Sequence, residues 1–106
     1  MSPLWTRADV VAATSGVAEG ADWIANGVSI DSRTLQKEDL FVAIKGENSD
    51  GHDYVVKAFE RGASAAVVSD VTQAMRNAGP LVIVPDALEA LNQLGRAARR
   101  RTGAKI

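Results

Sequence analysis

The stretch Ile30-Asp-Ser-Arg-Thr-Leu-Gln-Lys-Glu-Asp-Leu-Phe-Val-Ala-Ile-Lys-Gly-Glu-Asn-Ser-Asp-Gly-His-Asp-Tyr54 places one short apolar run between two polar segments. The run at 40–44 contains no polar residue, which is typical of a strand covered on both faces. Two further short runs, at 65–69 and 81–84, are apolar except for Ser69. Buried strands that alternate with helical patterns predict an α/β domain.

Helical patterns fill the intervals between the apolar runs. Thr6 and Asp9 have the spacing of a helix cap, Gly16 is expected to end that first helix, and Asp86 is the expected cap of the last one. The other predicted elements are strands at 21–25 and 27–30, helices at 55–62 and 71–77, and a final helix with the apolar stripe Ala87, Leu91, Leu94 and Ala98. This order predicts a three-layer α/β/α fold with a mostly parallel central sheet, mixed at the edge where the first strands pair antiparallel.

The composition limits the functional class. The chain has 106 residues, enough for one domain, and its net charge of −1 gives no global field to attract nucleic acid or an anionic membrane. No apolar run approaches the roughly 20 residues of a membrane span. The absence of cysteine excludes disulfides and thiolate chemistry and favours a reducing, cytoplasmic compartment.

A first polar loop follows the predicted strand at 27–30. The Asp31 carboxylate can accept from backbone amides two residues on, Ser32 offers a hydroxyl, and Arg33 offers a planar cation suited to phosphate or carboxylate. On the tripeptide alone, a solvated turn with a surface ion pair is the favoured interpretation, because Asp and Ser are common in turns.

A second polar loop follows the apolar strand. Gly46 and Gly51 permit close backbone approach, while Asn48 and Ser49 supply donors and acceptors for a base or sugar. The loop leads into a helix start beside the carboxyl end of a strand, where α/β sheets often bind anionic ligands. Because the two loops flank one strand pair, they can converge on a shared pocket.

Other polar residues have plainer interpretations. His52 is the only histidine, which favours a hydrogen-bonded structural role and leaves a metal site without ligands. Lys45 reaches either a diphosphate or solvent. The chain lacks both phosphate-binding glycine signatures and any paired acid–base carboxylates. We therefore assign no catalytic residue, no metal and no cofactor to these 106 residues.

The chain resembles the N-terminal domain of the Mur ligases, which add amino acids to the peptidoglycan precursor. The resemblance rests on Leu4-Trp5-Thr6, the segments 27–33 and 39–46, Asp50-Gly51-His52-Asp53 and Gly62-Ala63. It implies a cytoplasmic three-domain ligase whose first domain, residues 1–106, holds the uridine-diphosphate end of a UDP-N-acetylmuramoyl peptide. It also implies ATP and Mg²⁺ in a following domain, the partner of this one.

Carried over by position, the resemblance implies a set of substrate-binding residues. They are Ile30, Ser32, Arg33, Lys45, Gly46, Glu47, Asn48, Ser49, Asp50, Gly51 and His52. Glu47 is expected to contribute a backbone contact at most, and the last three residues are expected to shape the loop exit. Glu38 stands where the family often has glycine, which predicts a different turn geometry there.

Two alternatives remain open. Trp5-Thr6 and the Asp50–Asp53 loop favour the branch of the family that adds a D-alanyl-D-alanine dipeptide, but the branch that adds a diamino acid shares the other signals. A non-enzymatic α/β interaction module is the alternative from another class. Its partner would dock on the arginines near the end of the last helix, at 96 and 99–101.

Overall fold

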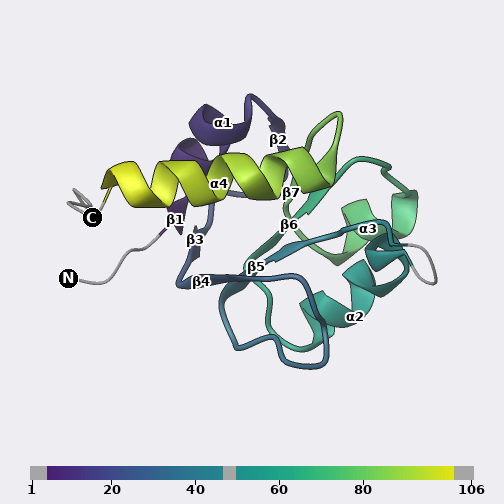
Figure 1. Ribbon diagram of the computed structural model, residues 1–106. Helices are drawn as coiled ribbons and strands as arrows, with labels where there is room; N and C mark the ends of the chain where they lie inside the picture. Colours follow the sequence, from purple (N-terminus) through teal and green to yellow (C-terminus); the bar gives the residue numbers. More distant parts are fainter. Residues whose placement is uncertain (1–4, 47–49, 102–106) are drawn as a thin grey trace.

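A five-stranded sheet with helices on both faces forms the centre of the computed structural model, which describes residues 5–46 and 50–101. The strand order is β2 (Val17–Glu19), β7 (Leu81–Ile83), β6 (Ala65–Val68), β5 (Asp39–Val42) and β4 (Gly27–Ser29). The β4–β5, β5–β6 and β6–β7 pairs are parallel, and only β2 pairs antiparallel, with β7. The predicted mostly parallel sheet, mixed at one edge, is therefore confirmed (Figure 1). The place of the antiparallel pairing was wrong, because the strand predicted at 27–30 is β4 and pairs parallel with β5.

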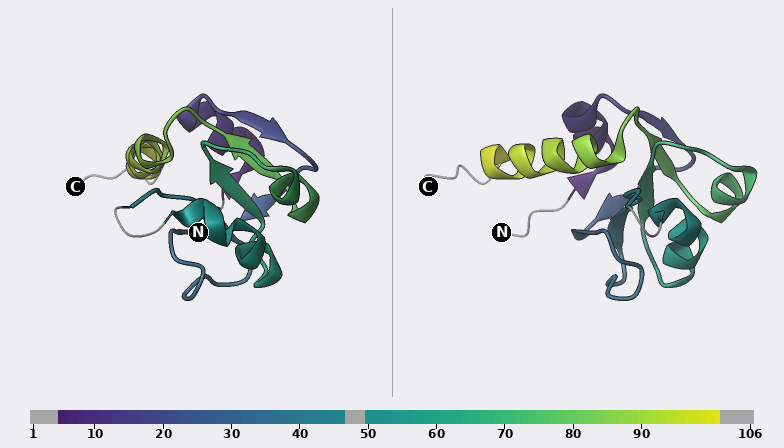
Figure 2. Two further views of the ribbon diagram at one scale, coloured as in Figure 1. Left: turned by 90° about the vertical axis from the view of Figure 1, so that its right-hand side faces the viewer. Right: turned by 45° about the vertical axis from the view of Figure 1, so that its right-hand side comes forward.

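The helices form two outer layers (Figure 2). One layer contains α1 (Arg7–Thr14) and α4 (Ala87–Arg101), which pack on each other over a core that includes Leu40 and Val67. The other contains α2 (Val55–Glu60) and α3 (Gln73–Ala78), over a core that includes Phe41 and Ala66. Every residue of β5 and β6 is buried, and their apolar side chains alternate between these two cores.

The N-terminal strands differ in part from the prediction. The expected strand at 21–25 is reduced to β3 (Ile24–Ala25), which pairs antiparallel with β1 (Trp5–Thr6) in a separate two-stranded sheet. The edge strand β2 was not predicted. It carries an exposed Val17 and has no alternating pattern, and it becomes a strand only because it lies beside β7, more than 60 residues away in the sequence.

Both predicted helix caps are present. The Thr6 hydroxyl accepts from the Asp9 amide at 3.1 Å, and the Asp9 carboxylate accepts from the Thr6 amide at 3.1 Å. The Asp86 carboxylate accepts from the amides of Leu88 and Glu89 at 2.9 and 3.2 Å. The end of α1 was placed wrongly.

Ser15, not Gly16, takes the left-handed C-cap position of α1, with φ 58°. A side chain at Gly16 would approach Val82 Cγ1 to 2.6 Å, so that glycine is required by close packing against β7.

No helix among the described residues is long and apolar enough to cross a membrane.

The chain after β5 leads into a short 3-10 helix, η1 (Gly51–Tyr54), before α2 begins. The predicted helix at 55–62 ends earlier, at Glu60, and Gly62 follows with φ +104°. The connection after β4 and the connection after β5 both start at the same end of the sheet, since the two strands are parallel neighbours. The fold thus brings the two polar loops to one edge.

Candidate functional site

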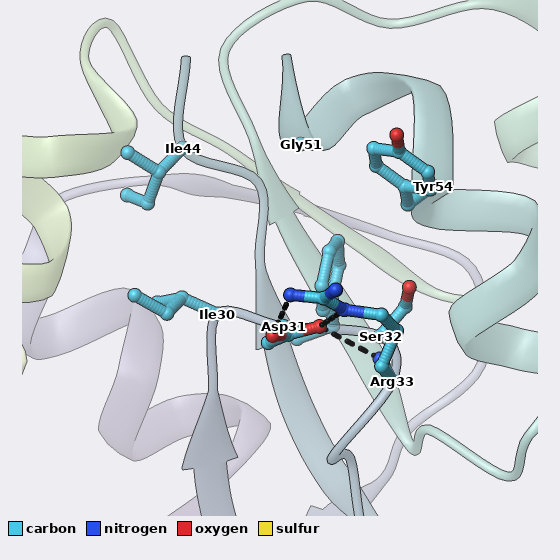
Figure 3. Close-up of a pocket in the computed structure, with 8 residues that line it drawn as sticks. Ile30, Asp31, Ser32, Arg33, Ile44, Gly51 and Tyr54 are labelled. Atoms are coloured by element: carbon cyan, nitrogen blue, oxygen red, sulfur yellow. Dashed lines mark hydrogen bonds and ion pairs between the residues drawn. The ribbon is translucent and has the colours of Figure 1, made fainter. Parts of the chain in front are cut away.

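A pocket of about 450 Å³ lies at the carboxyl ends of β4 and β5. Its lining comes from both loops and from the end of β5: Ile30, Asp31, Ser32, Arg33, Phe41, Ile44, Gly51 and Tyr54. Figure 3 shows the side chains of Ile30 and Ile44 on one side and those of Ser32 and Tyr54 on the other. The pocket therefore combines an apolar wall with a polar, partly aromatic one.

The first loop is a compact hydrogen-bonded turn. The Ser29 hydroxyl donates to the Asp31 carbonyl at 3.0 Å, and the Thr34 amide donates to the same carbonyl at 3.2 Å. The Asp31 carboxylate accepts from the Arg33 amide at 2.8 Å, as predicted. Ser32, at the centre of the turn, is only 5% exposed, and no described residue hydrogen-bonds its hydroxyl, which is consequently free for a ligand in the pocket.

The cationic group of the first loop is paired within the loop itself. Arg33 donates to the Asp31 carboxylate from Nε at 3.1 Å and from Nη2 at 3.0 Å. These side-chain bonds, with the Arg33 amide as the next cause, hold the pKa of Asp31 below its ordinary value. The surface ion pair considered for this tripeptide is therefore present, on the wall of the pocket, and the guanidinium faces Asp31 (Figure 3).

The second loop is closed at its base by main-chain contacts. Lys45 and Asp50 form an isolated antiparallel bridge, and the Gly51 amide donates to the Ile44 carbonyl at 2.8 Å. A Cβ atom at Gly51 would lie 2.7 Å from the Ile44 nitrogen, so only glycine permits this approach. The base of the loop thus brings two pocket-lining residues, Ile44 and Gly51, into contact.

His52 lies beneath this base, is 9% exposed, and is not among the lining residues. Its Nδ1 is 2.7 Å from Asp50 Oδ1, and its Nε2 accepts from the amides of Ser69 and Asp70 at 3.0 and 3.2 Å. The structural interpretation of the lone histidine is confirmed. Because both ring nitrogens have partners within the protein, a direct contact of the ring with a ligand does not fit this structure.

The predicted site residues fall into four groups. Four of them, Ile30, Ser32, Arg33 and Gly51, line the pocket. Lys45 and Gly46 are exposed where the second loop begins, and Asp50 and His52 support the base of that loop. The other three, Glu47, Asn48 and Ser49, lie outside the described residues. The two loops meet at one pocket, as the sequence predicted. What the second loop contributes through its central residues stays a prediction.

Sequence reasoning missed four of the eight lining residues: Asp31, which was expected only to fix the turn, Phe41, Ile44 and Tyr54. Tyr54 is 43% exposed in η1, and Ile44 is half-buried just beyond β5. A signal for Tyr54 was available, because an aromatic residue two positions after the only histidine lies one turn into a helix start beside the loop. Among the described residues, no group of three or more His, Cys, Asp or Glu side chains could hold a metal ion.

Comparison with known proteins identifies relatives of the whole region. The profile of the family described as "Mur ligase family, catalytic domain" matches residues 25–102. The UDP-N-acetylmuramoyl-L-alanyl-D-glutamate–2,6-diaminopimelate ligase of Chlorobaculum tepidum is 37% identical over 94 residues, 84% of this chain and 18% of that protein. The UDP-N-acetylmuramoyl-tripeptide–D-alanyl-D-alanine ligase of Bacillus subtilis is 31% identical over 99 residues, 93% of this chain and 22% of that protein.

Solved structures agree with the sequence comparison. A crystal structure of MurF from Acinetobacter baumannii has a TM-score of 0.82 and 29% identity, covering 92% of this chain and 22% of that one. The chain spans about a fifth of the length of the curated relatives that it matches.

Proposed function

This chain belongs to the Mur ligase family, and we propose that it is the domain of a longer, three-domain ligase that binds the uridine-diphosphate end of a UDP-N-acetylmuramoyl peptide. Residues 1–106 form that domain, and an ATP-binding domain follows in the same polypeptide. The names of the relatives from Chlorobaculum tepidum and Bacillus subtilis both describe ligases of UDP-N-acetylmuramoyl peptides, which supports this substrate class. The cytoplasm is the expected compartment.

The observation that carries the proposal is the pocket between the two polar loops. Its volume of about 450 Å³ falls within the roughly 300–1,000 Å³ usual for small-molecule sites. The apolar side chains of Ile30 and Ile44 suit one face of a uracil ring, and the Ser32 hydroxyl suits a polar edge. An anchor of this kind supplies binding energy far from the reacting group.

The chemistry of the whole enzyme is proposed to lie outside these residues. ATP with Mg²⁺ would convert the carboxylate of the peptide into an acyl phosphate, to be attacked by an incoming amine. The sequence has no phosphate-binding glycine loop, so this domain contributes substrate affinity and orientation. Its residues hold the nucleotide and move no proton.

The amine that we propose is D-alanyl-D-alanine. The MurF structures support this choice, with a TM-score of 0.82 over 92% of the chain, as does the Trp5-Thr6 opening. Addition of a diamino acid is the second candidate, favoured by the 37% identity to the Chlorobaculum tepidum ligase. An amine-specificity assay on the full-length protein separates the two, because each ligase should accept only its own amine.

The test of nucleotide binding is a titration of the chain with uridine diphosphate and with UDP-N-acetylmuramoyl-tripeptide, followed by amide NMR. We expect shifts confined to residues 30–33 and 46–54. In the full-length ligase, Ser32→Ala and Asn48→Ala should each raise KM for the nucleotide substrate with little change in kcat. Glu60→Gln, an exposed position on α2, is the matched control and should leave KM unchanged.

Two results would count against the proposal. One is the absence of shifts at millimolar ligand. The other is a loss of kcat without a change in KM. A protein that binds no uridine nucleotide but loses a captured partner on change of Arg99 would instead favour the interaction module.

A further inference from the structure

A buried imidazole connects the second loop to the neighbouring strand of the sheet. His52 stands at the start of η1, one residue after the pocket-lining Gly51. Its Nε2 accepts from the amides of Ser69 and Asp70, which directly follow β6. The ring therefore links the connection after β5 to the connection after β6, since Ser69 and Asp70 lie 17 and 18 residues after His52 in the sequence.

The hydrogen bonds fix the proton on one ring nitrogen. Two backbone N–H groups point at Nε2, and the Ser69 hydroxyl lies 3.4 Å from the same atom, so Nε2 must be an acceptor. The proton is then on Nδ1, which donates to Asp50 Oδ1 at 2.7 Å. Asp50 Oδ1 also accepts from the His52 amide at 2.9 Å, which keeps the carboxylate in place.

These bonds hold the base of the second loop. Asp50 bridges Lys45 across that base, and the next residue, Gly51, donates to the Ile44 carbonyl. Ile44 and Gly51 are both part of the pocket lining. The His52 ring holds Asp50 at the end of β6. Because Asp50 is bridged to Lys45 and is followed by Gly51, the ring also holds the part of the pocket wall that Ile44 and Gly51 form.

We propose that His52 is a positioning residue for the pocket. Its neutral Nδ1–H tautomer holds the base of the second loop against the end of β6, and so sets nucleotide affinity without touching the nucleotide. The proposal rests on the proposed function for the identity of the ligand, uridine diphosphate. It assigns the two halves of the ring different tasks: Nδ1 organises the loop, and Nε2 fixes the loop to the sheet.

Two conservative variants separate these tasks. Glutamine places an acceptor near the position of Nε2 and loses the donor to Asp50, whereas asparagine places a donor near Nδ1 and leaves the Ser69 and Asp70 amides without an acceptor. We expect the loss of the Nδ1 donor in His52→Gln to weaken uridine diphosphate affinity by no more than about threefold, because the backbone amide of residue 52 still donates to the Asp50 carboxylate. His52→Asn and His52→Ala should weaken it by about tenfold or more, because the competent loop conformation becomes less populated.

The measurements combine calorimetric titration with uridine diphosphate, imidazole ¹⁵N spectra and amide hydrogen exchange in the ligand-free chain. The wild-type spectrum should show a protonated Nδ1 and an unprotonated Nε2 at neutral pH. The Gly51 amide should exchange faster in His52→Asn than in His52→Gln. Val10→Ala, a core change on the buried face of α1, controls for general destabilisation: it should lower Tm but keep the affinity.

Each outcome has a separate meaning. A protonated Nε2, or native affinity and native Gly51 exchange in His52→Asn, would overturn the positioning role. Faster Gly51 exchange in His52→Asn supports the loop anchor even in a chain that fails to bind uridine diphosphate. That last combination would count against the proposed function alone, so the two failures are distinguishable.

Discussion

Arg33 and Asp31 face each other on the wall of the pocket, joined by hydrogen bonds of 3.1 Å from Nε and 3.0 Å from Nη2. The Arg33 side chain is 84% exposed, so the pair is solvated and its geometry can exchange. A carboxylate beside the proposed site for uridine diphosphate would repel that ligand unless a cation neutralised the carboxylate. We infer that the arginine compensates Asp31 first, and that any bond to phosphate comes second.

This inference predicts the behaviour of a double-mutant cycle. Arg33→Ala should weaken uridine diphosphate binding by up to about fivefold at low salt, because it leaves the Asp31 charge uncompensated. Adding Asp31→Asn should restore the affinity, since the asparagine can still accept from the Arg33-position amide. Titration calorimetry at two salt concentrations checks both. A double variant as weak as Arg33→Ala would show that the guanidinium itself holds the ligand.

Replacement of glycine by alanine should have opposite effects on stability at two positions, Gly51 and Gly95. Gly51→Ala should destabilise the chain by about 1–3 kcal/mol, since its Cβ would meet the Ile44 main chain at 2.7 Å and strain the pocket wall. Gly95→Ala should stabilise it by about 0.5–1 kcal/mol, because Gly95 is exposed inside α4 and no atom beyond its chain neighbours and the nearby helix backbone lies within 4 Å of the new Cβ. Urea unfolding measures both. Equal changes in the two variants would contradict the argument.

Replacement of Glu38 by glycine should stabilise the folded chain. The Glu38 φ of +71° lies in the left-handed region, which is the backbone conformation that glycine favours. The predicted difference in turn geometry from the family stays a prediction. Glu38→Gly should raise the free energy of unfolding by up to about 1 kcal/mol, offset in part by the lost bond from Asn26 Nδ2. Glu38→Ala, which loses that bond and keeps the strain, should be less stable than the wild type. Thermal unfolding of the three chains checks the order.

The hydrogen bonds to the Asp50 carboxylate should make the folded chain less stable in acid. The His52 amide, and then the His52 ring, hold the pKa of Asp50 below its ordinary value of 3.8. As the pH falls, the carboxyl of the unfolded chain therefore takes up a proton before that of the folded chain does. The stabilisation from Asp50 is complete above pH 3.8, and it is lost as the pH falls from there through the lowered pKa of the folded state.

In Asp50→Asn this part of the acid dependence should be absent. The measurement is the urea midpoint at a series of pH values between about 5 and 3. Asp31→Asn is the companion variant, because the pKa of Asp31 is lowered by a different partner, Arg33. An Asp50→Asn chain with the slope of the wild type would refute the assignment.

Local sequence determined most of the elements. Hydrophobic runs specify the buried strands β5, β6 and β7, and the short-range caps at Thr6 and Asp86 specify where α1 and α4 begin, since a cap involves residues only two or three apart. The same locality made the two polar loops visible. Their convergence followed from one inference, that neighbouring parallel strands end at the same edge.

Tertiary structure decided the features that depend on distant partners. Val17–Glu19 has no strand pattern, and it is a strand because β7 offers it a free edge. The Nε2 atom of His52 finds its donors only where β6 lies beside β5, and Tyr54 joins the pocket only because η1 turns it there. Such contacts are set by the packing of the whole sheet, and no sequence window contains both partners.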